Sequence, residues 1–240
     1  MTVATESPTP TPAQQLDAAE QQADAELQAI ITAAVAAGLS GAAILAVLAA
    51  LTGAVSAAAQ QGFTVGAQIV LQGAAGRRAR MRQLTVEPMP TTVEADVRAV
   101  VEDVARRIDA AIAEGQGQAA PTTPDGATRA PVTVADPATE LARFRRRMTA
   151  VAIAKIHQAT SSATYSYARW LGLDLVWVIR RDGKACAVCT AMRGQRARAG
   201  EKFTPPRGRG IPRRLWAGFQ GLPPAHPHCR CRPVPATPRT

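Results

Sequence analysis

The sequence HPHCRC, residues 226–231, gathers two of the chain's three histidines and two of its four cysteines into six positions. The other two cysteines, Cys186 and Cys189, form a C-x-x-C pair upstream. A tight turn of that spacing aims two thiolates at one point about 2.3 Å away, and a tetrahedral metal needs a second half-site to complete it. The two segments therefore predict one metal centre that closes the loop 190–225.

The closing segment offers more donors than a tetrahedral metal can use. Pro227 restrains the backbone beside His226, so that His226 and Cys229 can face the same way as an H-x-x-C pair. His228 and Arg230 are then expected to face outward. The first choice of ligands is Cys186, Cys189, His226 and Cys229, and the alternative fourth ligand, in place of His226, is Cys231.

Zinc is the metal that this donor set favours. The N-terminus has no basic start followed by an apolar stretch, so we expect no secretory signal and a reducing compartment, where paired thiols hold metals more often than they form disulfides. Nothing in the sequence suggests redox chemistry, which favours Zn²⁺ over iron. Four protein ligands leave no open position, so the expected zinc is structural.

Positive charge is concentrated in the same part of the chain. Residues 176–240 carry 14 basic and 2 acidic side chains, whereas residues 1–139 carry 8 and 14. Such a field attracts polyanions, of which nucleic acid is the commonest, although a solvated surface or an acidic protein partner is the alternative. The expected phosphate contacts are Arg193, Arg196, Arg198, Arg207, Arg209, Arg213 and Arg214.

The segments before the C-x-x-C pair read as regular structure. Residues 175–183, LVWVIRRDG, predict a strand that ends in a turn at Asp182 and Gly183. A long helix is expected from about residue 138 to residue 170. Residues 115–137 have the Pro, Gly and Thr content of a linker, and residues 91–114 repeat apolar side chains at steps of three and four, as an amphipathic helix does.

The N-terminal part is rich in alanine and poor in charge. Residues 1–14 read as a disordered Thr/Pro-rich tail and residues 15–114 as a helical region. No charged residue occurs from Leu27 to Gly76, and residues 39–57 are long enough to span a bilayer. Gly38 followed by Ser40 instead predicts one helix ending and another being capped. Two buried Ala-rich helices are therefore preferred to a membrane span.

Taken together, these patterns predict a mainly α protein, in which a helical N-terminal region precedes a small α+β C-terminal module stapled by zinc. Aromatic residues make up only 4 % of the chain, while Ala, Val and Leu supply most of its apolar content. That composition favours closely packed helices over a thick β core. The expected domain that contains the long helix, the strand and the zinc module covers residues 138–240.

The C-terminal segments LVWVIRRDGKACAVCTAMRGQ, EKF and GLPPAHPHCRCRPV closely resemble the phage Mu F-like head morphogenesis family, the minor head proteins of tailed phages. The resemblance covers about a quarter of the chain, and Ala187 departs from a position where the family often has proline. The matching positions are Trp177, Asp182, Cys186, Cys189, Gly194, Gln195, Phe203, Pro223, Pro224, His226, Pro227, Cys229, Arg230 and Cys231.

The resemblance implies a virion component that is made in the host cytoplasm and built into the phage head. It implies a structural role in capsid assembly at the portal vertex, with the portal protein and capsid or scaffolding subunits as partners. Double-stranded DNA is the further partner expected from the basic charge. No enzymatic activity and no small-molecule substrate are expected.

Two other functions stay open at this point. A zinc-containing nuclease or DNA-processing enzyme would need a histidine as general base and further groups for a catalytic metal. Residues 176–240 offer only Asp182, Glu201 and the spare His228 for those roles. A membrane-active ejection factor would instead use residues 39–57.

Overall fold

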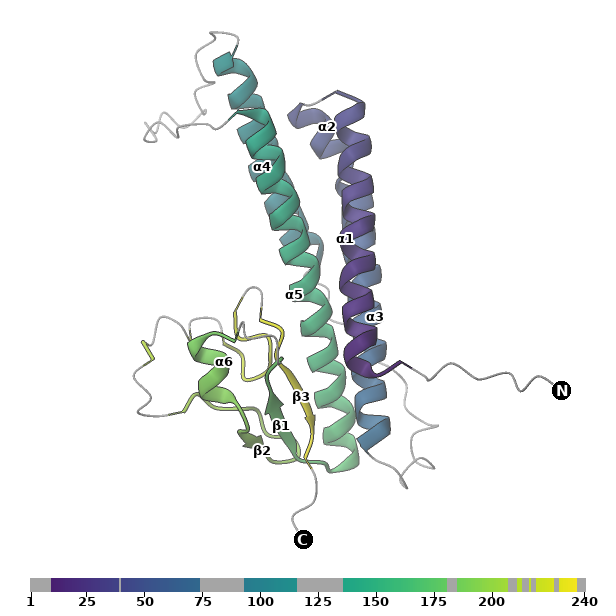
Figure 1. Cartoon of the computed structure of the whole chain (residues 1–240), viewed down its shortest axis with the longest axis vertical. Coiled ribbons are helices and arrows are strands. Elements are labelled where there is room, and N and C mark those ends of the chain that lie inside the picture. Colours follow the sequence, from purple (N-terminus) through teal and green to yellow (C-terminus); the bar gives the residue numbers. More distant parts are fainter. Residues whose placement is uncertain are drawn as a thin grey trace, which may run out of the picture. The chain divides into compact units, whose positions relative to one another are not determined.

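The computed structural model describes residues 10–38, 40–73, 93–115, 136–180, 185–206, 211–212, 216, 219–226 and 229–236. Most of these residues are helical, and a small sheet lies in the C-terminal part (Figure 1), which confirms the predicted mainly α fold with an α+β C-terminal module. The helices are α1 (Pro12–Ala36), α2 (Gly41–Ala46), α3 (Leu48–Gly73), α4 (Val93–Gly115), α5 (Pro137–Leu171) and α6 (Ala187–Met192). The strands are β1 (Leu175–Val178), β2 (Arg196–Ala197) and β3 (Arg232–Pro235).

Contacts divide the chain into two units, each assembled from separate segments. The first unit comprises the described parts of Met1–Gln21, Ala59–Met89 and Ile156–Thr240, and the second comprises those of Gln22–Ala58 and Pro90–Lys155. The division falls inside α1, α3 and α5, so each of these helices contributes residues to both units. The predicted linker 115–137 lies almost entirely outside the described residues.

Helix α4 supplies an apolar stripe to the second unit. Val97, Val101 and Ile108 are completely buried, as their spacing in the sequence predicts. The charged side chains of the opposite face form ion pairs along the helix, among them Arg98 with Glu94 at 2.7 Å. Burial of one face therefore orders this helix, and its exposed pairs add little.

The break between α1 and α2 follows from local signals. Gly38 has a φ of +113°, which favours glycine, and the Oγ of Ser40 accepts a hydrogen bond from the backbone N–H of Ala43 at 3.1 Å. The N–H of Gly41 donates to Asp109 Oδ1 on α4 at 2.7 Å. A Cβ at Gly41 would lie 2.8 Å from the carbonyl oxygen of Ala105, so only glycine fits this contact. The predicted end and cap are therefore confirmed.

The uncharged stretch 39–57 does not form one continuous helix. Helix α2 ends at Ala46, and α3 begins at Leu48. Leu51 and Val55 of α3 are completely buried within the second unit. Among the residues that the structure describes, no helix is both long enough and apolar enough to cross a membrane.

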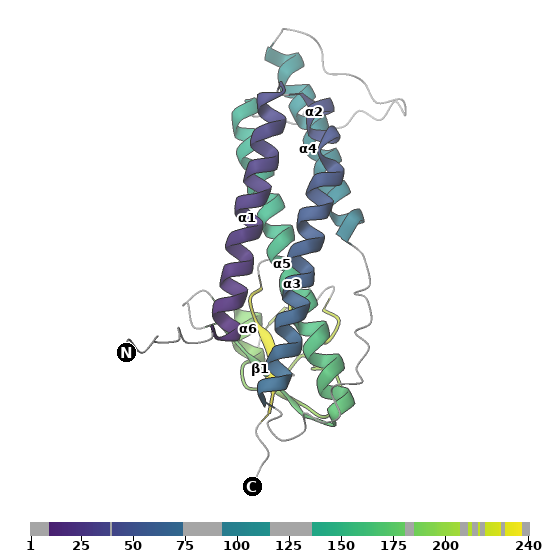
Figure 2. The ribbon, with the colours of Figure 1, turned by 90° about the vertical axis from the view of Figure 1, so that its right-hand side faces the viewer.

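In the first unit, the C-terminal halves of α3 and α5 pack through small residues, side by side in Figure 2. A Cβ at Gly62 would overlap the carbonyl oxygen of Ile156, and one at Gly66 would overlap that of Thr160. The Thr160 hydroxyl donates a hydrogen bond to the Gly62 carbonyl at 2.9 Å. The two backbones approach so closely because neither glycine carries a side chain.

The sheet has the antiparallel order β2-β1-β3, with Trp177 of β1 opposite Pro233 of β3. Trp177 is completely buried and makes an edge contact with Phe203, at a centroid separation of 5.3 Å. The predicted strand is shorter than expected, because β1 ends at Val178. The predicted turn at Asp182 and Gly183 lies outside the described residues.

Candidate metal centre

The C-x-x-C pair lies at the start of helix α6. Cys186 is the N-cap of this helix, and its Sγ accepts a hydrogen bond from the backbone N–H of Cys189 at 3.4 Å. The N–H of Thr190 closes the first turn on the Cys186 carbonyl at 2.9 Å. This turn brings Cys186 and Cys189 to the same end of α6, and Cys189 is buried there.

The segment that follows the predicted loop 190–225 lies against this turn. His226 Nε2 lies 2.9 Å from Cys186 Sγ and 3.3 Å from Cys189 Sγ. Cys229 Sγ lies 3.5 Å from Cys189 Sγ. Two ligands of a tetrahedral zinc with Zn–S bonds of about 2.3 Å lie roughly 3.5–3.8 Å apart, so these separations are close to those of a metal site.

Two overlapping groups of three ligands result, and both could hold a metal ion. The first group contains Cys186, Cys189 and His226, and the second contains Cys189, Cys229 and Cys231. Cys189 belongs to both. The structure therefore brings together all four residues of the predicted site and also the alternative ligand, Cys231. A donor set of four thiols and one imidazole suits a soft or borderline metal ion.

The buried thiols share protons among themselves. The hydrogen bond between Cys189 and Cys229 raises the pKa of the Cys189 thiol far above its usual value and lowers that of Cys229. Two thiols this close favour a single negative charge between them, because repulsion opposes a second thiolate. A divalent cation would take the place of such protons, because metal ligands bind as thiolates.

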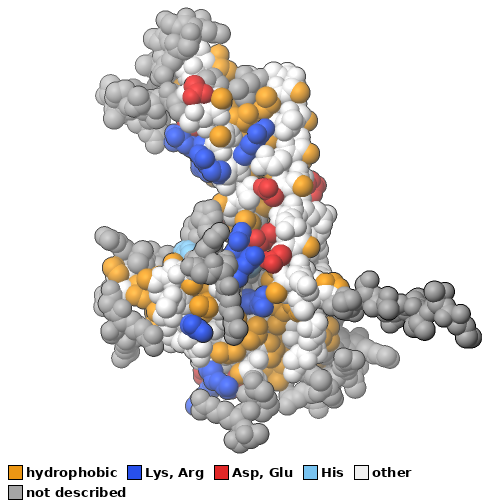
Figure 3. Space-filling model, in the orientation of Figure 1, with side chains coloured by type: hydrophobic (Ala, Val, Ile, Leu, Met, Phe, Trp, Pro, Cys, Tyr) orange, Lys and Arg blue, Asp and Glu red, His pale blue; other side chains and the backbone are white. Residues whose placement is uncertain are grey.

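Three of the seven arginines predicted to contact nucleic acid can be placed. Arg193, Arg196 and Arg198 are exposed, and all three follow α6. Arg207, Arg209, Arg213 and Arg214 lie outside the described residues. Among the described residues on the face drawn in Figure 3, some Lys and Arg side chains lie beside Asp and Glu side chains at the middle of the view.

The expectation that Arg230 faces outward is wrong. Its guanidinium is half-buried and lies 2.9 Å from Glu20 Oε2 on α1. The reason is the alternation of an extended chain, which turns Cys229 and Cys231 toward the metal ligands and Arg230 toward the opposite side. His228, for which the same expectation was made, lies outside the described residues.

Sequence reasoning missed the group that Arg230 joins. His157 on α5 is buried, and its Nε2 lies 2.8 Å from Glu20 Oε1. Arg180, just after β1, lies 3.0 Å from Asp17 and 3.6 Å from Glu20. These residues come from four distant parts of the chain, and each alone reads as an ordinary charged or core position. Only the folded chain shows that they belong together.

Comparison of the chain with protein-family models, with curated proteins and with solved structures found no match in any of the three.

Proposed function

We propose that the chain is a structural minor head protein of a tailed phage, with a C-terminal module closed by a structural zinc ion. One observation supports this most. The two half-sites that carry the sequence resemblance, Cys186 with Cys189 and the segment 226–231, meet at one place in the fold. A motif whose parts come together in space serves a common purpose, and these parts are metal ligands.

The proposed zinc ligands are Cys186, Cys189, His226 and Cys229. The contacts of His226 Nε2 with both thiols of the C-x-x-C pair support its inclusion. Cys231 is the alternative, because it lies with Cys189 and Cys229 in the second group. The ion would join the start of α6 to the segment that leads into β3. We assign it no catalytic role, since four protein ligands leave no position for water or substrate.

Metal analysis tests the zinc. Protein purified without chelator should contain about one zinc per chain by plasma mass spectrometry. Its zinc content should fall after dialysis against a strong chelator and return on adding Zn²⁺. Protein that never contains zinc, and does not take it up, would overturn this part of the proposal.

The head assignment needs a test in particles. The phage or prophage that encodes the chain should incorporate it into purified heads, in far fewer copies than the major capsid protein. Quantitative mass spectrometry measures that ratio, and cross-linking followed by digestion should join the chain to portal or capsid subunits. Complete absence from purified particles would contradict the assignment.

Contact with double-stranded DNA is the third part of the proposal, and the exposed Arg193, Arg196 and Arg198 support it. If these side chains neutralise phosphates, affinity for a DNA duplex should fall steeply as salt rises. Replacing all three by glutamine should weaken binding and reduce the dependence on salt, as measured by fluorescence anisotropy. Unchanged affinity and salt dependence would exclude these arginines as phosphate contacts.

A further inference from the structure

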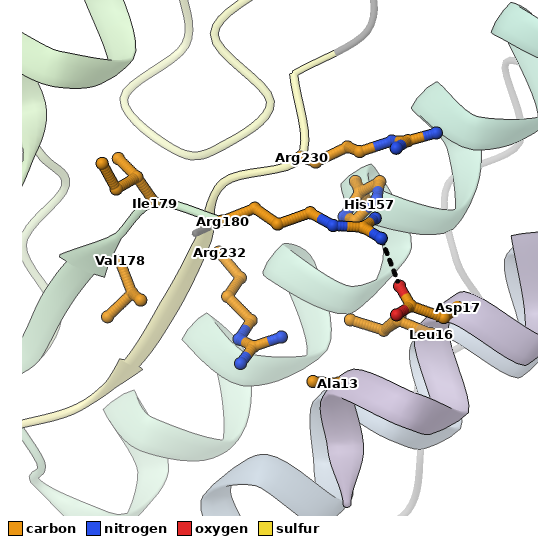
Figure 4. Close-up of a pocket in the computed structure, with 9 residues that line it drawn as sticks. All are labelled: Ala13, Leu16, Asp17, His157, Val178, Ile179, Arg180, Arg230 and Arg232. Atoms are coloured by element: carbon orange, nitrogen blue, oxygen red, sulfur yellow. Dashed lines mark ion pairs between the residues drawn. The ribbon is translucent and has the colours of Figure 1, made fainter. Parts of the chain in front are cut away.

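The first unit contains a cavity of about 260 Å³ that the proposed function does not use. Figure 4 shows Arg180, Arg230 and Arg232 entering it from the side of β1 and β3, and Asp17 and His157 from the side of α1 and α5. Pockets for drug-sized ligands measure about 300–1,000 Å³, so this one suits a smaller molecule. The charges of the side chains that line the cavity indicate the chemical class of that molecule.

The acidic side chains here compensate only part of the basic charge. One carboxylate oxygen of Glu20 forms an ion pair with Arg230 at 2.9 Å, and the other lies 2.8 Å from the imidazole of His157. Asp17 forms an ion pair with Arg180 at 3.0 Å, which is marked in Figure 4. Among the residues that the structure describes, two carboxylates therefore face three guanidinium groups, which leaves an excess of positive charge.

Arg232 carries that excess. It forms no ion pair within 4.0 Å with any residue that the structure describes, although it is half-buried. Burial lowers the pKa of its guanidinium and Asp17 raises it, while the charge of Arg180 lowers it further. A partly desolvated cation that forms no ion pair with a described residue is costly, and an anion bound in the cavity would offset that cost.

The sequence alternation explains how this arginine comes to line a cavity. Arg230 and Arg232 alternate with Cys229 and Cys231, so that the thiols lie with the metal ligands while the guanidinium groups line the cavity. The segment CRCR therefore serves two faces of the same module.

We propose that this cavity binds a phosphate group, held by Arg232 together with Arg180 and Arg230. Planar guanidinium groups bind phosphate and carboxylate oxygens in pairs. A phosphate is favoured because it offers at least three oxygens to three arginines, whereas a carboxylate offers two. The buried His157 also lines the cavity, and its Nδ1 has no hydrogen-bond partner among the described residues.

The phosphate can come from free phosphate or from a phosphomonoester such as the end of a nucleic acid strand. A continuous DNA backbone suits the site less well, because Asp17 and Glu20 would repel neighbouring phosphates. The cavity does not include Arg193, Arg196 or Arg198, so its phosphate binding is a separate proposal from their contacts with duplex DNA.

Calorimetric titration of the full, zinc-loaded chain with inorganic phosphate tests the site. Phosphate should bind, and acetate at equal ionic strength should bind at least tenfold more weakly. Arg232→Gln should reduce the phosphate affinity at least tenfold, whereas Arg169→Gln, on an exposed residue outside the cavity, should leave it unchanged. Equal binding of phosphate and acetate, or equal affinity of Arg232→Gln and the parent chain, would overturn the proposal.

A second variant distinguishes a specific loss of phosphate affinity from misfolding. Asp17→Asn removes a carboxylate that competes for Arg180, so it should tighten phosphate binding severalfold. Weaker binding in Asp17→Asn would contradict the electrostatic argument. A misfolded chain would not produce the expected gain.

Short single strands with and without a 5′-phosphate identify the source of the phosphate. If the phosphorylated strand binds more tightly than the unphosphorylated one, and Arg232→Gln abolishes that difference, the site recognises strand ends. Binding of inorganic phosphate alone would assign it to the free anion. The zinc content of the same sample is measured beforehand, and neither result depends on incorporation into particles, so failure here is distinguishable from failure of the proposed function.

Discussion

The helical second unit and the described part of the segment from Leu175 to Pro235 are built from different kinds of element. The helical unit buries apolar side chains that recur along long helices, such as Val97, Val101 and Ile108 of α4. The part of the C-terminal segment that the structure describes has two strands of four residues, one of two residues and a helix of six. These short elements and their connections bury Trp177, Met192 and Phe203, and a cluster of five side chains that could hold a metal lies among them. We therefore expect burial to order the first region and bound metal to add stability to the second.

Replacing Cys189 tests this contrast most strongly, because Cys189 belongs to both groups of ligands. Cys189→Ser should abolish stoichiometric zinc binding, which contributes roughly 10 kcal/mol in small zinc domains. Near-ultraviolet circular dichroism from Trp177 and its aromatic neighbours should be lost, while most of the helical far-ultraviolet signal persists.

Thr190→Ala is the matched control, since Thr190 is the exposed neighbour of Cys189 on α6. It should keep both the zinc and the aromatic signal. If Cys189→Ser instead abolished the helical signal as well, the two regions would fold as one, and the contrast between them would fail.

Substitution of the two candidates for the fourth ligand should have the next largest effect, a change in zinc affinity. With His226 as a ligand, His226→Ala should weaken zinc binding by about a hundredfold or more, equivalent to about 2.7 kcal/mol. Cys231→Ser should change it by less than about threefold. Competition with a chelating dye measures both affinities, and the cobalt absorption spectrum reports the number of thiolates. The reverse order of effects would assign Cys231 as the ligand.

Helix packing supplies a test in which no metal is involved. Gly62→Ala should destabilise the chain by about 2 kcal/mol, because the new methyl group would overlap the Ile156 carbonyl between α3 and α5. Gly53→Ala on the same helix has nothing within 4 Å of its Cβ and should stabilise by about 0.5–1 kcal/mol. Urea unfolding measures both. Equal effects would mean that helix propensity, and not the close approach, decides.

The sequence predicted those features that depend on neighbouring residues. The cap at Ser40 and the stripe of α4 follow from local pattern, and the two half-sites were recognised because cysteine and histidine are rare in this chain. Strand β2 escaped prediction because two residues carry no periodicity. The pairing of Glu20 with Arg230 depends on segments at opposite ends of the chain, and no local rule connects them.

The smallest expected effect concerns a surface pair of the helical unit, Asp103 with Arg147. Burial alone would raise the pKa of Asp103, but the hydrogen bond from Arg147 and the charge of Arg107 lower it below its ordinary value. The unfolded chain therefore takes up a proton first as pH falls. The stabilisation is complete above an unfolded pKa of about 3.9 and is lost as the pH falls through the lower pKa of the folded state. Because Asp103 is partly exposed, Asp103→Asn should lower the free energy of unfolding by less than about 1 kcal/mol at pH 7.

Urea unfolding between pH 6 and pH 3 should show a shallower loss of stability in Asp103→Asn than in the parent chain. Parallel curves would mean that this pair contributes nothing, and that burial alone stabilises the helical unit.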